Sequence, residues 1–297
     1  MMIDAKANLR TVRDALRYAV TQFNEAGLFF GHGQVDAFDE AAFLVLRALA
    51  LPLERMDYFL DAFLTMGEIT SLLQLIDRRV RSRIPAAYLL NEAWLAGSRF
   101  YVDARCIIPR SFIAELLKDD LQPWIADADA VRGVLDLCTG SGCLAILAAN
   151  SFPNADVDAI DISMDALAVA TRNVEEYKLR SRVRLLSSNL FEAIDSRRYD
   201  LILCNPPYVT DASMEELPAE YRHEPRVALA GGADGMDLVR TIVRQARGHL
   251  QPGGMLVVEV GDGRETIERL FPDIAFTWLT TSAGDDMVFL AQRDDLP

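Results

Sequence analysis

The hydrophobic pattern of the chain changes once, near residue 95. Before that point apolar residues recur at three- and four-residue intervals, the spacing of one face of an α-helix. A first predicted helix carries Leu9, Val12, Leu16, Ala19 and Phe23, and a third carries Ile69, Leu72, Leu73, Ile76 and Val80. Between them a second helix is predicted after Asp39, whose side chain is expected to cap it, ending before Pro52.

The third predicted helix ends in a cluster of arginines, Arg78, Arg79, Arg81 and Arg83, before Pro85. Cations are favoured at a helix C-terminus, and we expect Arg78, Arg79 and Arg81 on the surface. Residues 1–93 are therefore predicted to form a small helical domain. An alternating stretch at 94–110, with strands around 100–102 and 106–108, predicts a hairpin linker closed by Pro109.

After the linker, short apolar runs alternate with amphipathic segments. Strands are predicted at 134–137, 157–160, 183–186, 201–204 and 255–260, and helices at 144–149, 165–177 and 238–250. Alternation of this kind predicts an α/β domain over 111–297, with a parallel sheet covered on both faces. Two further strands around the turn at 282–286 predict an antiparallel finish to that sheet.

The composition, 51% hydrophobic and 25% charged, is typical of a globular protein. The opening MMIDAKANLR lacks the basic and apolar regions of a signal peptide, and no apolar run is long enough for a membrane span. We therefore expect a cytoplasmic protein without membrane contacts. Cys106, Cys138, Cys143 and Cys204 form no CxxC pair, so we expect reduced cysteines and no metal site.

The net charge of −14 is unevenly distributed. Residues 1–95 hold 10 basic and 12 acidic side chains, whereas residues 96–297 hold 20 and 32. An acidic catalytic region argues against a nucleic acid held through its phosphates and favours a basic partner. Ordinary solubility would explain the same charge.

The first candidate site is the segment Asp136-Leu137-Cys138-Thr139-Gly140-Ser141-Gly142, placed between a predicted strand and a predicted helix. Glycines allow close approach of a ligand there, but the segment has neither the GxGxxG spacing of a dinucleotide site nor the GK[ST] ending of a phosphate loop. Asp161 ends the next strand, where a carboxylate can accept both hydroxyls of a ribose. The pattern favours adenosine without phosphate; a structural turn with Asp161 as a helix cap is the alternative.

The second candidate site is Asn205-Pro206-Pro207-Tyr208, directly after a predicted strand. Two prolines make a rigid turn. The Asn205 side-chain oxygen and the Pro206 carbonyl can together accept the two N–H groups of an amide or an exocyclic amine. The Tyr208 ring can stack on that planar group and lie near a positive sulfonium.

Together these motifs resemble methyltransferases that act on glutamine amides or adenine amines. Nearly the whole chain resembles the bacterial N5-glutamine methyltransferases, in the branch that acts on the third large-subunit ribosomal protein. The local markers of that branch are Gly31-His32-Gly33, Asp39-Glu40-Ala41, Ala87-Tyr88-Leu89, Asn91-Glu92-Ala93-Trp94, Cys138 in place of the commoner glycine, and Tyr221-Arg222-His223-Glu224-Pro225.

The resemblance implies a Rossmann-like class I fold and S-adenosylmethionine as the cofactor. It implies that Asp136, residues 138–142 and Asn205 bind the cofactor, with residues 138–142 around its methionine part and Asp161 at its ribose. Asn189 and Leu190 would flank the adenine. The family usually has aspartate at the position of Asn189; asparagine can still accept a hydrogen bond, without charge assistance.

The resemblance further implies a ribosomal protein as substrate, and the charge favours a basic one. We expect the helical domain to recognise it, because the catalytic loops account for the cofactor and the amide but not for the choice of one glutamine; helices that only cover one end of the sheet are the alternative. Glutamine methylation of peptide release factors is one alternative. Adenine-N6 methylation is another, which the charge of residues 96–297 disfavours because base extrusion requires a grip on phosphates. A cofactor-binding assembly factor without activity would be expected to have lost Asn205 or Pro206, and both are intact. The sequence does not indicate an oligomeric state.

Overall fold

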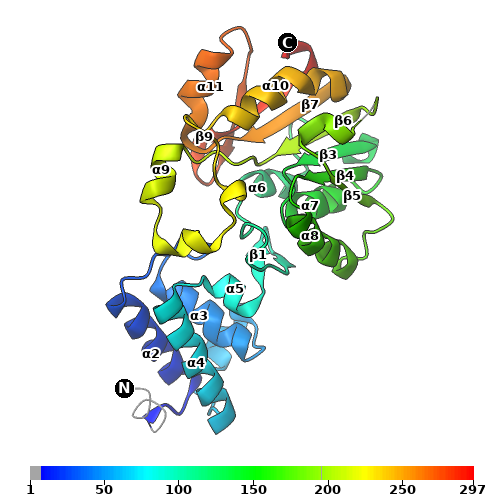
Figure 1. The fold of residues 1–297 in the computed structure, drawn as a ribbon. Helices are drawn as coiled ribbons and strands as arrows, with labels where there is room; N and C mark the ends of the chain where they lie inside the picture. Colours follow the sequence, from blue (N-terminus) through cyan, green and yellow to red (C-terminus); the bar gives the residue numbers. More distant parts are fainter. Residues whose placement is uncertain (1–7, 195) are drawn as a thin grey trace. The chain divides into compact units, whose positions relative to one another are not determined.

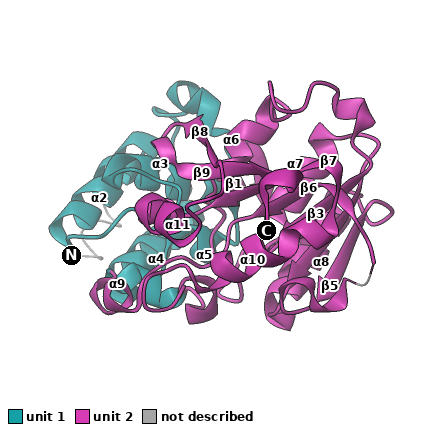
Figure 2. Cartoon of the chain, turned by 90° about the horizontal axis from the view of Figure 1, so that it is seen from above, with its two compact units in different colours: residues 1–93, 218–223 teal, residues 94–217, 224–297 magenta. Residues whose placement is uncertain are grey.

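A computed structural model describes residues 8–194 and 196–297. Residues 1–7, part of the opening segment considered for a signal peptide, lie outside this range. The chain divides into two compact units (Figure 2), each with its own hydrophobic core. Unit 1 comprises residues 1–93 and 218–223, and unit 2 comprises residues 94–217 and 224–297.

Unit 1 is helical. Its helices are α2 (Val12–Glu25), α3 (Ala37–Ala48), the 3-10 helix η1 (Leu53–Tyr58), α4 (Met66–Ser82) and α5 (Ala86–Leu90), together with the short η4 (Ala219–His223). The predicted apolar stripe is confirmed for Val12, Leu16, Ala19 and Phe23, which are buried in α2. Leu9 is buried as well but precedes the helix. The helix starts with a reciprocal cap in which Thr11 and Asp14 bond each other's backbone N–H.

The predicted cap of the second helix is wrong by one turn. Asp36 is the N-cap of α3, and its Oδ1 accepts the backbone N–H groups of Phe38 at 2.8 Å and Asp39 at 2.9 Å. Asp39 lies in the first turn, where its charge favours the positive end of the helix dipole. Asp36 and Asp39 are both of a residue type that commonly caps helices, so the sequence alone does not identify the N-cap. The backbone conformation shows that it is Asp36.

The expectation that Arg79 lies on the surface is also wrong. Its side chain is fully buried, donates to Glu40 and to the Phe29 carbonyl, and lies 3.5 Å from Glu220. Arg79 continues the stripe of Leu72 and Ile76 at helical spacing, so its position on α4 faces the core. A buried guanidinium requires carboxylate partners, and Glu220 comes from a distant part of the chain.

The linker hairpin is shorter than predicted. Strands β1 (Ala93–Leu95) and β2 (Ser98–Phe100) pair around Ala96 and Gly97, which have φ angles of 52° and 80°. Two consecutive positive φ values are typical of the tight turns that join such strands. The strand expected at 106–108 does not form, and the Ile108 backbone N–H donates to Glu224 instead.

Unit 2 contains a seven-stranded sheet in the order β5-β4-β3-β6-β7-β9-β8 (Figure 1). Its strands are β3 (Gly133–Leu137), β4 (Asp156–Asp161), β5 (Val183–Ser187), β6 (Tyr199–Cys204), β7 (Leu250–Glu259), β8 (Thr277–Thr281) and β9 (Gly284–Gln292). Strands β3 to β7 are parallel, and β9 runs antiparallel to both β7 and β8. The predicted parallel sheet with an antiparallel finish is confirmed.

Helices cover both faces of this sheet. They are α6 (Ile113–Lys118), α7 (Cys143–Ser151), α8 (Met164–Glu176), α10 (Asp237–His249) and α11 (Arg264–Leu270), whereas α9 (Asp211–Glu216) follows the turn after β6 and has no buried residue. Alternate residues of each central strand enter two separate cores: Val257 packs with residues of α6 and α7, whereas Leu256 and Val258 pack with residues of α10 and α11. Strands buried on both faces explain the continuous apolar runs of the sequence.

Candidate active site

Four loops leave the same edge of the sheet in unit 2. The parallel register pairs Leu137 of β3 with Cys204 of β6 on one side and with Ile160 of β4 on the other. The loop after β3 and the turn after β6 therefore start side by side. Between these two strands the order of the sheet switches from β5-β4-β3 to β6-β7. Open α/β sheets bind ligands at this kind of switch point, at the carboxyl ends of the strands.

The loop after β3 is built around Asp136. Its carboxylate is fully buried, and Oδ2 accepts the Thr139 hydroxyl at 2.5 Å and the Ala145 backbone N–H at 3.0 Å. Oδ1 has no hydrogen-bond partner among the described residues. Burial raises the pKa of Asp136 to about 7, against the lowering effect of both bonds. The carboxylate thus holds the loop and the start of α7 together.

The two glycines of this loop have different roles. Gly142 has φ of 79°, and a Cβ there would lie 3.1 Å from the Ala170 Cβ, so it permits close packing of α7 against α8. Gly140 has φ of 55°, and a Cβ would approach only Ile107, at 3.6 Å. Gly140 therefore leaves backbone accessible to a ligand. Cys138 also has a positive φ, 59°, which glycine adopts more readily.

Asp161 lies at the end of β4 and faces this loop. Its Oδ2 accepts the Gly140 backbone N–H at 2.9 Å, and its Oδ1 accepts the Ser163 backbone N–H at 2.8 Å. Burial raises its pKa, and these two bonds partly offset that effect. The helix α8 is capped by Ser163 rather than by Asp161. The carboxylate retains lone pairs for further donors.

Asn189 and Leu190 follow β5 at the same edge. The Asn189 Nδ2 donates to Glu192 at 2.8 Å, so its Oδ1 is the side of the amide available as an acceptor. Asn189 is exposed, whereas Leu190 is buried with φ of 48°. The acceptor of Asn189 and the apolar side chain of Leu190 therefore lie in adjacent positions. An acceptor suits a donor on the edge of a purine, and an apolar side chain suits its face.

The turn after β6 presents the side chains of Asn205 and Tyr208. The Asn205 Nδ2 donates to the Arg110 carbonyl at 3.4 Å, and the Tyr208 hydroxyl donates to Glu259 Oε1 at 3.1 Å. The chain then pairs back on itself, with the Gly231 N–H donating to the Val209 carbonyl at 2.8 Å. The segment that returns from residue 224 therefore closes against the motif.

Three glycines that sequence reasoning missed surround Tyr208. A Cβ on Gly231 would lie 2.7 Å from the Tyr208 Cα, one on Gly235 would lie 2.2 Å from its carbonyl oxygen, and one on Gly261 would lie 2.7 Å from its ring. A side chain at any of these positions would force Tyr208 or its neighbours to move. The only signal in the sequence is the local density of glycine in 231–235 and 261–263.

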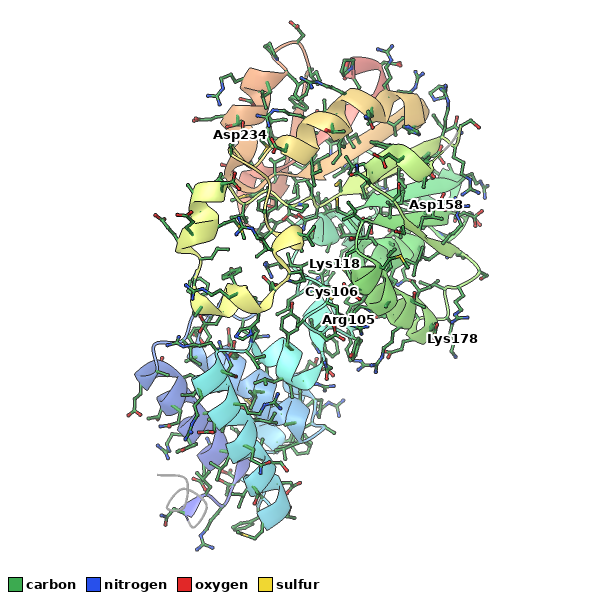
Figure 3. The ribbon with its side chains drawn as sticks, in the orientation of Figure 1. Arg105, Cys106, Lys118, Asp158, Lys178 and Asp234 are labelled. Carbon is green, nitrogen blue, oxygen red and sulfur yellow. The ribbon has the colours of Figure 1, made fainter. Side chains whose placement is uncertain are left out.

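Two buried thiols, those of Cys106 and Cys143, are not available as thiolates near this edge. Burial raises the pKa of Cys106, which is labelled in Figure 3, and of Cys143 to about 12, so both are protonated near neutral pH. No group of three or more His, Cys, Asp or Glu side chains among residues 8–194 and 196–297 is arranged to hold a metal ion. None of the helices in the described part of the chain is long and apolar enough to cross a bilayer.

Comparisons with known proteins agree with this architecture. Residues 115–220 match the family model described as "Methyltransferase small domain". The chain is 55% identical over 303 residues to the ribosomal protein uL3 glutamine methyltransferase of Burkholderia pseudomallei, covering 100% of this chain and 99% of the relative. The proteins of the same name from Bordetella pertussis and Bradyrhizobium diazoefficiens are 54% and 49% identical, covering 100% and 98% of this chain and 99% and 93% of theirs.

Among solved structures, the hMettl16 catalytic domain in complex with the MAT2A 3'UTR hairpin 1 resembles the chain with a TM-score of 0.51 at 15% identity. The match covers 77% of this chain and 82% of that one. At this identity the resemblance concerns the fold alone, the Rossmann-like class I arrangement of sheet and helices.

Proposed function

Because this chain belongs to the family of the ribosomal protein uL3 glutamine methyltransferases, we propose that its substrate is the side-chain amide of a glutamine in that ribosomal protein. The chain is an enzyme, a methyltransferase that uses S-adenosylmethionine. We place its reaction in the cytoplasm, where ribosomal proteins are made. The observation that carries the proposal is the position of Asn205 and Tyr208 at the end of β6, next to the glycine loop of β3.

The residues at this edge fit S-adenosylmethionine. The unpartnered Oδ1 of buried Asp136 and the open backbone at Gly140 form a polar cradle without a device for phosphates. Asp161 would accept the ribose hydroxyls, Asn189 and Leu190 would hold the adenine, and residues 138–142 would surround the methionine part. When bound, the cofactor supplies an electrophilic methyl group on a positive sulfonium.

Asn205 and Pro206 would orient the substrate amide. The Asn205 Nδ2 faces the Arg110 carbonyl, so Oδ1 is the atom left to accept one amide N–H, and the Pro206 carbonyl would accept the other. Two acceptors in fixed positions define the plane of the amide and turn its nitrogen lone pair to one face. The Tyr208 ring would stack on that plane.

Placement supplies most of the acceleration in this scheme. An amide nitrogen is a poor nucleophile because its lone pair is delocalised, and no side chain of the motif is a strong base. Effective molarities of about 10⁵ to 10⁸ M show that orientation can contribute on the required scale. The two carbonyl oxygens would also stabilise the positive charge that grows on nitrogen, after which a proton leaves to water.

The proposal is tested with the ribosomal protein itself. The purified enzyme and labelled S-adenosylmethionine are incubated with purified uL3 and, separately, with a peptide release factor and an adenine-containing RNA hairpin. We expect label only in the ribosomal protein, on a glutamine side chain identified by mass spectrometry. Label in the release factor or the RNA with none in uL3 would reject the proposed substrate.

We further propose that the helical unit recognises the protein substrate. Three of its large apolar side chains are strongly exposed within one short segment: Tyr58 at 85%, Phe63 at 81% and Met66 at 60%. The same segment carries the carboxylates of Asp57 and Asp61. Exposed aromatic residues next to acidic ones suit a basic protein surface, with which aromatic residues can stack and carboxylates can pair.

Surface substitutions test this better than removal of the unit. Deleting residues 1–90 would leave buried Glu220 without Arg79 and Arg83, its partners in the same unit. We expect Tyr58→Ser with Phe63→Ser to raise KM for uL3 about 10-fold or more with kcat nearly unchanged, because binding remote from the chemistry is lost. The control is Trp124→Ser, which removes an exposed aromatic of unit 2. An unchanged KM in the double variant would reject recognition at this segment.

A further inference from the structure

A segment of three residues, Arg110 to Phe112, lies between two buried carboxylates and contacts the proposed amide-binding residue. Glu224 and Glu259 hold this segment, and both are at most 5% exposed. Neither carboxylate is part of the Asn205–Tyr208 motif. All of these residues belong to unit 2.

Glu224 holds the segment through its side chain. The guanidinium of Arg110 donates to both carboxylate oxygens, Nη1 to Oε1 and Nη2 to Oε2, each at 2.6 Å. Oε1 also accepts the backbone N–H of Ile108 at 2.9 Å. A planar two-bond fork fixes the guanidinium in orientation as well as position. The chain around residue 110 is therefore fixed at two points by one buried group.

Glu259, the last residue of β7, holds the other end of the segment. Its Oε2 accepts the Ser111 hydroxyl at 2.7 Å and the Phe112 backbone N–H at 2.9 Å. Its Oε1 accepts the Tyr208 hydroxyl at 3.1 Å. One carboxylate thus links the segment to the ring that is proposed to stack on the substrate.

The segment sets the orientation of the Asn205 amide. Only the Nδ2 face of this amide can donate, and it donates to the Arg110 carbonyl at 3.4 Å. A rotation of the amide by 180° would bring Oδ1 against that carbonyl, oxygen to oxygen. The position of the Arg110 carbonyl therefore decides whether Oδ1 is presented to the substrate.

We propose that Glu224, acting through Arg110, and Glu259, acting on Tyr208 and Ser111, are positioning residues for methyl transfer. The inference rests on the proposed roles of Asn205 and Tyr208. The hydrogen bonds of both carboxylates go to residues 108–112 and to Tyr208, on the substrate side of the site, so we expect their loss to lower kcat and to leave cofactor binding nearly unchanged.

The experiment compares Glu224→Gln with a matched variant, Asp158→Asn. Asp158, labelled in Figure 3, is likewise a buried carboxylate of unit 2 in a fork with an arginine, Arg184, but it lies in the middle of β4. Steady-state kinetics on uL3, cofactor titration and thermal melting are measured for both. Glu259→Gln is measured alongside as the second positioning residue.

We expect kcat of Glu224→Gln to fall about 10- to 100-fold, because a misplacement of about 1 Å at a reacting group has effects of that size. The cofactor Kd should stay within about 3-fold, and Asp158→Asn should keep its kcat even if it melts earlier. A Glu224→Gln variant with full kcat overturns the proposal. So does an equal fall of kcat in Asp158→Asn, which would indicate a general loss of stability.

Two further measurements separate other outcomes. If Glu224→Gln does not fold, Arg110→Lys tests the same link, since lysine keeps the charge but not the fork. If the unmodified enzyme does not methylate uL3, the proposed substrate is wrong. The positioning of Asn205 is then tested without substrate, through its side-chain amide signals in ¹⁵N NMR spectra. We expect Arg110→Lys to shift them and Asp158→Asn to leave them in place; unchanged signals in Arg110→Lys would overturn the proposal.

Discussion

The loop after β3 and the turn after β6 begin side by side at the sheet edge, yet they are stabilised in different ways. The loop is held by its own residues and by the strand and helix that follow it: Asp136 bonds Thr139 and Ala145, Asp161 of β4 bonds Gly140, and Asn173 of α8 bonds the Ser141 carbonyl. The turn is held by residues from distant parts of the chain, namely Arg110, Gly231, Gly235, Glu259 and Gly261.

This difference has a functional consequence. A loop that carries its own bonds keeps its shape when distant parts of the protein change, so cofactor binding should be robust. A turn whose shape depends on distant contacts should lose substrate chemistry when any of these contacts is disturbed. Substitutions around the two motifs should therefore separate into those that change Kd for the cofactor and those that change kcat.

The largest effect is expected at the turn itself. We expect Asn205→Ala to reduce methyl transfer by about 1,000-fold or more, because an acceptor that orients the amide and stabilises the growing charge is lost. The cofactor Kd, measured by calorimetry, should stay within about 3-fold. Asn150→Ala, an exposed asparagine at the end of α7, is the control. Turnover at the unmodified rate would remove Asn205 from the mechanism.

A smaller but still large effect is expected from Gly261→Ala. The added Cβ would lie 2.7 Å from the Tyr208 ring, so the ring must move, and kcat should fall by about 10- to 100-fold. Gly253→Ala is the matched control, because Gly253 also has a positive φ, 77°, but no neighbour within 4 Å of an added Cβ. Equal kcat in the two variants would show that Tyr208 tolerates displacement.

The same difference between the two motifs explains what the sequence could predict. Periodicity predicted the helices of unit 1 and the parallel sheet of unit 2, because each element carries its own pattern. The residues of both motifs were identifiable because their chemistry is contiguous in the chain. Glu259 and the glycines around Tyr208 were not, because nothing near them in sequence specifies their partner, which for Glu259 is 51 residues away.

The error at Arg79 in unit 1 has the same origin. Arg79 was assigned to the surface from its charge, although its helical register with Leu72 and Ile76 predicts burial. The prediction followed the charge of Arg79 because the carboxylates that stabilise the buried guanidinium, Glu40 and Glu220, lie 39 and 141 residues away in the sequence. Local rules describe a residue's own preference, and long-range partners can reverse it.

On the cofactor side, Asp161→Ala should raise the Kd for S-adenosylmethionine by about 10- to 100-fold, as expected for the loss of charge-assisted hydrogen bonds of about 1.5 to 3 kcal/mol. At saturating cofactor, kcat should change little. Asp165→Ala, an exposed carboxylate in the first turn of α8, is the control. An unchanged cofactor titration would leave Asp161 with a purely structural role.

Asp136 should make the stability of the folded protein depend on pH. Its pKa is raised in the folded protein to about 7, so between its unfolded value near 3.9 and about 7 the folded state binds more protons than the unfolded state. Its contribution to stability therefore falls as pH rises through this window. The melting temperature of the cofactor-free protein should fall less from pH 5 to pH 8 in Asp136→Asn than in the unmodified protein. Asp156→Asn, at the exposed start of β4, should show no such flattening.

The smallest effect is expected at Cys138, a residue with a Cβ at a positive φ. Its φ of 59° costs a residue with a Cβ about 1 to 2 kcal/mol, whereas glycine adopts it freely but loses about 0.5 to 1 kcal/mol of chain entropy on folding. Cys138→Gly should therefore melt about 1 to 3 °C above Cys138→Ala, which keeps the Cβ and its strain. Because Asp136 and Asp161 hold the loop, both variants should bind S-adenosylmethionine within about 2-fold of the unmodified protein. A tenfold weaker Kd in either variant would mean that the loop depends on the Cys138 side chain and is not self-contained.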